Sequence, residues 1–257
     1  MLAIDFNGKT ALVTGASSGI GQSIAAMFAK AGANVAGCAR SKNEAAFAEL
    51  IQPYGVDYLY HSCDVTHVEE LQTLVDTVVA RFGRIDFLVS NAGRNMFKGA
   101  ETCTQEDWDA NMRLNLVPHW KLAQLCKPHL EKQQGVIIIM TSNHAFSTIP
   151  GCFPYNVTKT ALTGLVRSLA IEWGPAVRTV GIAPGFIDTE GNQTWFDSFS
   201  DTVAERKRTE DIHPVKRIGT SEEVGSWCVF LASEYSAFAS GTTYLLDGGR
   251  SALMQDF

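Results

Sequence analysis

The 257-residue chain has no apolar run long enough to cross a bilayer. Its longest strongly apolar stretch is Val136–Met140, whereas a membrane-spanning helix needs about 20 such residues. The first residues lack a basic region followed by a long apolar run, so we expect no secretory signal. We therefore expect a cytoplasmic protein with no membrane partner.

Blocks of lysine or arginine are also missing. The chain has 21 basic and 27 acidic residues, which gives a formal net charge of −6. Nucleic acids and anionic membranes are bound by clustered positive charge. We therefore exclude nucleic acid as a partner and expect a small-molecule substrate instead.

The six cysteines, at 38, 63, 103, 126, 152 and 228, form no Cys-x-x-Cys pair. Scattered cysteines of this kind are typical of reduced, mostly buried thiols in a cytosolic protein. The six histidines show no metal-ligand spacing with each other or with carboxylates. The sequence therefore predicts neither a disulfide framework nor a metal site.

The chain does contain an alternation of apolar, strand-like runs with helical patterns. Hydrophobic residues make up 46% of it, which allows a sizeable core. Predicted strands cover 10–14, 34–39, 58–63, 86–90, 135–141, 177–183 and 243–246, and predicted helices cover 20–30, 41–50, 68–82, 108–130, 154–173 and 221–232. This order predicts a single α/β domain over 1–257. Its core would be a doubly wound, Rossmann-like parallel sheet of about seven strands with helices on both faces.

The segment 189–214 breaks this alternation. It is polar, carries Trp195, Phe196 and Phe199, and leaves the carboxyl end of a predicted strand. Ligands bind at that edge of such sheets, and a long excursion there is typical of a lid. A surface insertion without a role would have the same sequence character, but we predict a substrate lid.

A glycine-rich turn joins the first predicted strand to the first predicted helix. Gly15, Gly19 and Gly21 follow the pattern Gly-x-x-x-Gly-x-Gly. Glycines permit positive φ and let backbone N–H groups approach a pyrophosphate closely, and the helix N-terminus favours negative charge. The placement between a strand and a helix predicts a dinucleotide-binding turn.

Tyr155 and Lys159 have the i, i+4 spacing that places two side chains on one face of a helix. A phenol titrates near pH ~10, and a neighbouring ammonium lowers that pKa because it stabilises the phenolate. The pair is therefore suited to moving a proton to or from an oxygen. Alone, the same spacing also fits a solvated helix face with no function.

Taken together, the glycine turn and Tyr155-x-x-x-Lys159 resemble the short-chain dehydrogenase/reductase family, and the resemblance covers nearly the whole chain. The stretch 90–93, Ser-Asn-Ala-Gly, is similar to the family's Asn-Asn-Ala-Gly turn, with Ser90 in place of the first asparagine. Further matches are Asn115 on the central helix, Ser142 upstream of the tyrosine, Pro184-Gly185 after the sixth strand, and Thr189.

The resemblance implies a role for each matching residue. Tyr155 would be the general acid/base, Ser142 would hold the substrate oxygen, Lys159 would lower the Tyr155 pKa and bind the nicotinamide ribose, and Asn115 would hold a relay water. The implied cofactor-binding residues are Gly15, Ser17, Ser18, Gly19, Ile20, Gly21, Arg40, Asp64, Val65, Asn91, Ala92, Gly93, Tyr155, Lys159, Pro184, Gly185, Ile187 and Thr189.

The end of the second predicted strand bears on the choice of nicotinamide cofactor. NAD-preferring members of the family carry an aspartate there, whereas this chain has Ala39 followed by Arg40. A guanidinium can pair with a 2′-phosphate. We therefore predict a preference for NADP(H) and leave the use of NAD(H) open.

The substrate pocket is less sharply defined by the sequence. In a family-like fold, Ser142, Asn95, His144, Phe153 and Trp195 would line it, although each of the last four could equally be a packing or surface residue. Asn95 and His144 favour a sugar, a polyol or a hydroxy acid. The aromatic side chains leave room for a larger ketone or an acyl thioester.

These residues predict an NADP-dependent oxidoreductase that interconverts a secondary alcohol and a ketone. The alternatives are a 3-oxoacyl-thioester reductase, which the negative charge disfavours, and a catalytically silent scaffold, which the presence of Ser142, Tyr155 and Lys159 disfavours. Because family members are usually tetramers or dimers, we predict a homo-oligomer, with a homotetramer as the first choice. We expect the tail 248–257 at a subunit interface.

Overall fold

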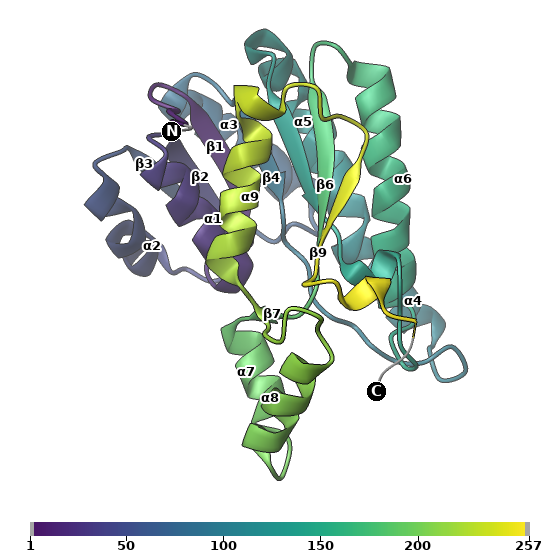
Figure 1. The fold of residues 1–257 in the computed structure, drawn as a ribbon. Helices are drawn as coiled ribbons and strands as arrows, with labels where there is room; N and C mark the ends of the chain where they lie inside the picture. The colour runs from purple at the N-terminus through teal and green to yellow at the C-terminus, as the bar shows by residue number, and fades with distance from the viewer. Residues whose placement is uncertain (1–2, 255–257) are drawn as a thin grey trace.

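The computed structural model, which describes residues 3–254, is built around a seven-stranded parallel sheet (Figure 1). The strand order is β3-β2-β1-β4-β5-β6-β9. The strands are β1 Thr10–Thr14, β2 Asn34–Ala39, β3 Tyr58–Ser62, β4 Phe87–Ser90, β5 Val136–Met140, β6 Arg178–Pro184 and β9 Thr243–Leu246. The order reverses between β1 and β4, which confirms the predicted doubly wound sheet.

Helices cover both faces of the sheet, and a separate apolar core lies under each layer. On one face lie α1 Gly19–Lys30, α2 Glu44–Ile51 and α9 Ser221–Ala232; on the other lie α3 Val68–Phe82, α5 Val117–Gln133 and α6 Tyr155–Trp173. Ile24 and Phe28 of α1 and Leu71 and Leu74 of α3 are fully buried, as their helical spacing predicts. Within residues 3–254, each helix falls short of the length or the apolar character needed to cross a bilayer.

The predicted helix 108–130 is wrong in one respect, because the structure divides this region into α4 Gln105–Asn115 and α5. The break lies at Leu116, whose φ of −130° and ψ of −59° are not helical. Pro118 in the first turn of α5 explains the break. A proline has no N–H to donate to the carbonyl four residues earlier, so a continuous helix would lose a hydrogen bond there.

The segment 189–214 contains two helices, α7 Glu190–Phe196 and α8 Thr202–Asp211. They project beyond the sheet next to the short parallel pair β7 Ile187–Asp188 and β8 Gly219–Thr220 (Figure 1). Thr189 caps α7 by accepting from the Asn192 N–H, and Asp201 caps α8 by accepting from the Ala204 N–H. The excursion is therefore an ordered helical unit, and its role as a lid stays a prediction.

Asp86, a buried carboxylate just before β4, ties the start of that strand to β1. It is 3% exposed and accepts from the Thr10 N–H at 2.9 Å. The Arg84 guanidinium donates to both of its oxygens, at 2.8 and 2.6 Å. A buried carboxylate is stable only with such partners, so Asp86 fixes the β1–β4 register at the end of the sheet opposite the predicted ligand edge.

We expect Asp86→Ala to lower the free energy of unfolding by about 2 kcal/mol, because it leaves the Thr10 N–H buried without its acceptor. Asp57→Ala is the matched control. It removes an exposed ion pair with Arg81, which is worth below about 1 kcal/mol. Urea denaturation of both variants measures the difference, and equal losses would contradict this account of Asp86.

Candidate functional site

A cleft of about 1780 Å³ lies along the carboxyl ends of the strands. All eighteen residues predicted to bind a cofactor line it, and so do Ser142, Asn95, His144 and Trp195. Two predicted residues are placed elsewhere. Among the described residues, Phe153 is not part of the cleft wall and packs on Trp108, with ring centroids 5.6 Å apart, so this structure does not support its predicted substrate role. Asn115 lies fully buried behind the wall.

The glycine turn has the backbone that a pyrophosphate site needs. Gly15 and Gly19 have φ of 70° and 53°, and helix α1 begins at Gly19. A Cβ at Gly21 would lie 2.1 Å from the Gly15 carbonyl oxygen, so the turn closes only with glycine there. The N-cap residue of α1 is Ser18, and among the described residues its side chain makes no capping hydrogen bond to the first turn. The N–H groups of that turn are therefore available to an anionic ligand.

Thr14 at the end of β1 holds this turn against the turn that follows β4. Its hydroxyl accepts from the N–H groups of both Asn91 and Ala92 at 2.9 Å. The Asn91 side chain donates in return to the Thr14 carbonyl at 2.9 Å. These three hydrogen bonds fix the spacing of the two loops at the point where the strand order reverses.

The far end of the cleft is lined by Ala39, Arg40 and Ser41 from the end of β2 and by Asp64 and Val65 after β3. Arg40 is exposed, and the residue at the strand end is the neutral Ala39. Asp64 is turned toward its own loop, where its carboxylate accepts from the N–H and hydroxyl of Thr66 at 2.9 and 2.8 Å. The cleft therefore fits a dinucleotide both at the glycine turn and at its outer end.

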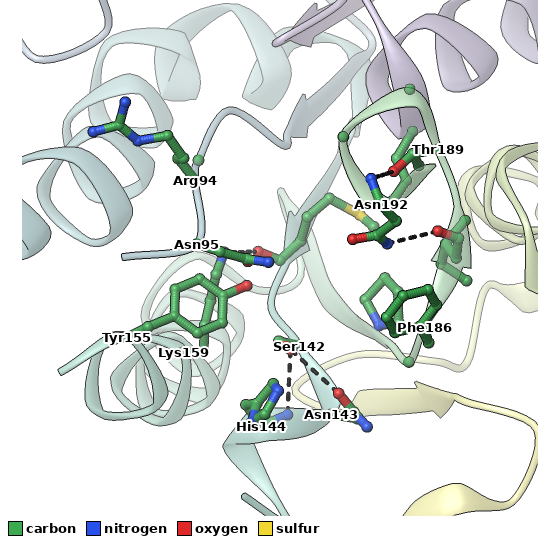
Figure 2. A pocket seen from close by; sticks show the side chains of 18 of the residues that line it. Arg94, Asn95, Ser142, Asn143, His144, Tyr155, Lys159, Phe186, Thr189 and Asn192 are labelled. Carbon is green, nitrogen blue, oxygen red and sulfur yellow. Dashed lines mark hydrogen bonds between the residues drawn. The ribbon is translucent and has the colours of Figure 1, made fainter. Parts of the chain in front are cut away.

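Ser142, Tyr155 and Lys159 converge on one wall of the cleft (Figure 2). Ser142 follows β5, Tyr155 is the first residue of α6, and Lys159 lies one turn further along that helix. Each is less than a tenth exposed. The Lys159 ammonium donates to the Met140 carbonyl at 3.1 Å, and the His144 N–H donates to the Ser142 hydroxyl at 3.2 Å.

Burial controls the protonation of this group. It raises the pKa of Tyr155 to about 12, and a hydrogen bond with Ser142 acts in the opposite direction. Burial also lowers the pKa of Lys159 to about 8. The direction for Tyr155 is opposite to the one predicted from the i, i+4 spacing, because loss of hydration disfavours the phenolate. At neutral pH, Tyr155 is therefore a proton donor.

Asn115 is part of a buried polar chain behind the wall. Its amide donates to the Asn111 side chain at 2.8 Å and to the Arg94 carbonyl at 3.0 Å, and its oxygen accepts from the Arg94 N–H at 2.9 Å. The Thr158 hydroxyl of α6, which donates to the Tyr155 carbonyl at 2.7 Å, lies 3.3 Å from the same Asn111 oxygen. Asn115 thus ties α4 to the loop after β4, and α6 packs on the same polar chain through Thr158.

The sequence did not predict several residues at the substrate end. Phe97 is 44% exposed and its ring lies 5.4 Å from that of Tyr155 and 5.8 Å from that of His144. Phe186, Asn143 and Asn192 also line this end (Figure 2). These residue types carry no chemical pattern of their own, so only the spatial arrangement reveals them. Burial lowers the pKa of His144, so this imidazole is neutral at neutral pH.

The C-terminal tail reaches the cleft of its own chain. Arg250, Ser251, Leu253 and Met254 line it, and the Ser147 hydroxyl donates to the Ser251 carbonyl at 3.5 Å. Asp247 fixes the turn into the tail by accepting from the Gly249 and Ser251 N–H groups. Residues 255–257 of the predicted tail lie outside the described residues, and its contact with another subunit stays a prediction.

The comparisons with known proteins identify the family. A family model described as Enoyl-(Acyl carrier protein) reductase matches residues 15–251. Human "Dehydrogenase/reductase SDR family member 4" is 36% identical over 94% of this chain and 87% of its own length. "D-threitol dehydrogenase" of Mycolicibacterium smegmatis is 34% identical, with 96% of each chain covered. The solved complex of 7α-hydroxysteroid dehydrogenase with NADH and 7-oxo glycochenodeoxycholic acid is 31% identical, with a TM-score of 0.89 and 96% of each chain covered.

The chain belongs to the short-chain dehydrogenase/reductase family. Its class of activity is that of an oxidoreductase acting on CH–OH groups with a nicotinamide cofactor. The glycine turn, the Thr14–Asn91 contact and the outer end of the cleft are the parts of this structure that fit such a cofactor.

We expect Gly21→Ala to weaken nicotinamide dinucleotide binding at least tenfold, because the new Cβ would collide with the Gly15 carbonyl and displace the turn. Gly164→Ala on α6 is the control, since a Cβ there meets nothing within 4 Å. The control should bind the cofactor normally and gain up to about 1 kcal/mol of stability. Titration with the cofactor, followed by protein fluorescence, measures binding by both variants. Unchanged binding by Gly21→Ala would contradict this role of Gly21.

Proposed function

We propose that the protein interconverts a secondary alcohol and a ketone of a sugar, polyol or hydroxy acid, with NADP(H) as the preferred cofactor. The observation that carries the proposal is the convergence of Ser142, Tyr155 and Lys159 on the cleft that begins at the glycine turn. A nicotinamide bound in the cleft would supply or accept the hydride. The protein's own residues then have to place the substrate oxygen and move one proton.

Tyr155 and Ser142 act on the substrate oxygen. In the direction of reduction, the Tyr155 phenol, which keeps its proton at neutral pH, donates it to the carbonyl oxygen. The Ser142 hydroxyl donates a hydrogen bond to the same oxygen and stabilises its developing charge. The nearby Lys159 ammonium makes loss of the phenol proton less costly. In oxidation the proton returns to Tyr155.

The chemistry of the substrate end supports a hydroxylated substrate. Asn95, Asn143, Asn192 and the neutral His144 are uncharged groups that can donate or accept hydrogen bonds. Within this group, the Asn192 side chain donates to the Ile187 carbonyl at 2.7 Å, and its amide oxygen remains a candidate acceptor for a ligand. The threitol dehydrogenase among the relatives is consistent with a polyol. Trp195 contributes an aromatic face at the mouth.

The cofactor preference rests on the end of β2. Ala39 leaves room where a carboxylate would repel a 2′-phosphate, and the exposed Arg40 guanidinium can pair with that phosphate. We also infer a homo-oligomer from family membership, as predicted from the sequence.

We expect Tyr155→Phe to lower kcat by about 10²- to 10⁴-fold, because it removes the proton donor, while the dinucleotide still binds. Tyr54→Phe, an exposed tyrosine away from the cleft, is the control. Turnover is measured at the nicotinamide absorbance with panels of sugars, polyols, hydroxy acids, ketones and a 3-oxoacyl thioester. Full activity of Tyr155→Phe would overturn the mechanism. Turnover of the thioester alone would overturn the proposed substrate class.

We expect Arg40→Asp to raise the Kd for NADPH by about 10- to 100-fold, because a phosphate contact is lost and a repulsive carboxylate is gained, while the Kd for NADH changes little or falls. Lys42→Asp makes the same charge change two residues away on an exposed side chain. Fluorescence titrations with both cofactors compare the variants. If Lys42→Asp alters NADPH binding as much as Arg40→Asp, Arg40 has no specific role.

A further inference from the structure

Ser90 and His119 form a buried polar pair that the proposed mechanism does not use. Ser90 stands where the family turn has an asparagine, and its hydroxyl lies 2.8 Å from the His119 Nδ1. The His119 ring is 1% exposed, and among the described residues its Nε2 has no hydrogen-bond partner. A buried nitrogen without a partner is unusual in a folded protein and calls for an explanation.

The His119 ring is neutral at physiological pH. Burial first, and then the positive charge of Lys159, lower its pKa to about 3, so the ring carries no charge near neutral pH. A neutral imidazole carries one N–H. The 2.8 Å contact between Nδ1 and the Ser90 hydroxyl allows that N–H to lie on Nδ1, with the hydroxyl as its acceptor. In that tautomer Nε2 presents a lone pair to the interior.

Chain neighbours of both Ser90 and His119 pack beside Lys159. A Cβ built on Gly93 would lie 2.9 Å from the Asn115 side-chain oxygen and 3.6 Å from the Lys159 nitrogen, so both groups pack on the same glycine. His119 follows Asn115 by one turn, just beyond the break at Leu116. Ser90 lies three residues before Gly93 at the end of β4. The pair thus lies on the interior side of the wall that carries Lys159.

The Lys159 ammonium has hydrogen-bond donors available for a further acceptor. Its ammonium carries three donors, and one of them goes to the Met140 carbonyl at 3.1 Å. A buried ammonium with few acceptors is costly. A ring nitrogen with no partner among the described residues and an ammonium with donors to spare therefore lie in the same part of the interior.

We propose that His119 is a positioning residue for Lys159: its Nε2 accepts, through one buried water, a hydrogen bond from the ammonium, and Ser90 holds the ring in the tautomer that this requires. The inference rests on the proposed role of Lys159 at the active site. It also accounts for Ser90, since a hydroxyl is short enough to leave the space that the imidazole occupies.

Loss of this acceptor would change the titration of Lys159. The groups that bear on its ammonium are Tyr155 on its own helix and His119 from α5, with His144 beyond Tyr155. Tyr155 and His119 are both neutral near pH 8. An acceptor stabilises the charged amine, so its removal lowers the pKa of Lys159 from about 8. The charge of Lys159 is then lost at a lower pH.

The test uses two acceptor-free variants, His119→Met and His119→Phe, so that a folding defect in one does not prevent the measurement. His119→Gln keeps an acceptor in the same region, and Leu122→Met, a buried residue of the same helix, controls for repacking. Reductive methylation of Lys159, followed by mass spectrometry of the protein without cofactor, reports the titration of this amine independently of turnover. The alkaline limit of kcat/KM for ketone reduction reports it in the working enzyme.

We expect the methylation midpoint of Lys159 to fall by about one pH unit in the acceptor-free variants, which is the effect of losing one hydrogen bond to a charged group. At pH 7 this corresponds to about fivefold faster labelling. The alkaline limit of reduction, near pH 8 in the parent enzyme, should move by the same amount, and His119→Gln and Leu122→Met should keep the parent values. An unchanged midpoint in both acceptor-free variants, or an equal shift in Leu122→Met, overturns the proposal.

The methylation result separates this proposal from the proposed function. If the midpoint shifts but no ketone or alcohol is turned over, the role of His119 stands and the function is wrong. If Tyr155→Phe abolishes turnover but the midpoint stays constant, the function stands and the role of His119 is wrong.

Discussion

The hydrogen bonds between Thr14 and the Asn91 loop are the contact on which the rest of the site depends. They join the ends of β1 and β4, the two neighbouring strands at which the sheet reverses its order. The glycine turn starts from one of these strand ends and the loop through Gly93 from the other. Because Gly93 in turn packs against Asn115 and Lys159, a shift at Thr14 would alter both the glycine turn and the wall that carries Lys159.

Burial of polar groups sets the protonation of the site. Tyr155, Lys159, Asn115 and His119 are all buried, and burial shifts the pKa values of the three that titrate. The stability of such groups depends on mutual hydrogen bonds, which here connect α4, α5 and α6 to the ends of β4 and β5. In such low-polarity surroundings the protonation of each residue depends on its neighbours. The chemistry of the site therefore depends on these four residues together.

The strands and most helices could be predicted because they follow directly from apolar periodicity. The break at Leu116 could also have been read from Pro118, but the surrounding helical pattern concealed it. The helices α7 and α8 are short and polar, and only their caps, Thr189 and Asp201, mark them in the sequence. The sequence could not show that Phe97, rather than Phe153, lines the cleft, because the direction of a loop side chain depends on tertiary packing. The direction of the pKa shift of Tyr155 could not be predicted either, because the burial of this residue results from the whole fold.

The C-terminal tail has a consequence for how this enzyme can diverge. Arg250 and Met254 in the tail form part of the cleft wall, whereas the glycine turn lies near the other end of the chain. Substitutions in the tail would therefore change the wall of the cleft at a point far along the chain from the glycine turn. Under the proposed function, such a separation would let a lineage exchange one alcohol for another through a few residues.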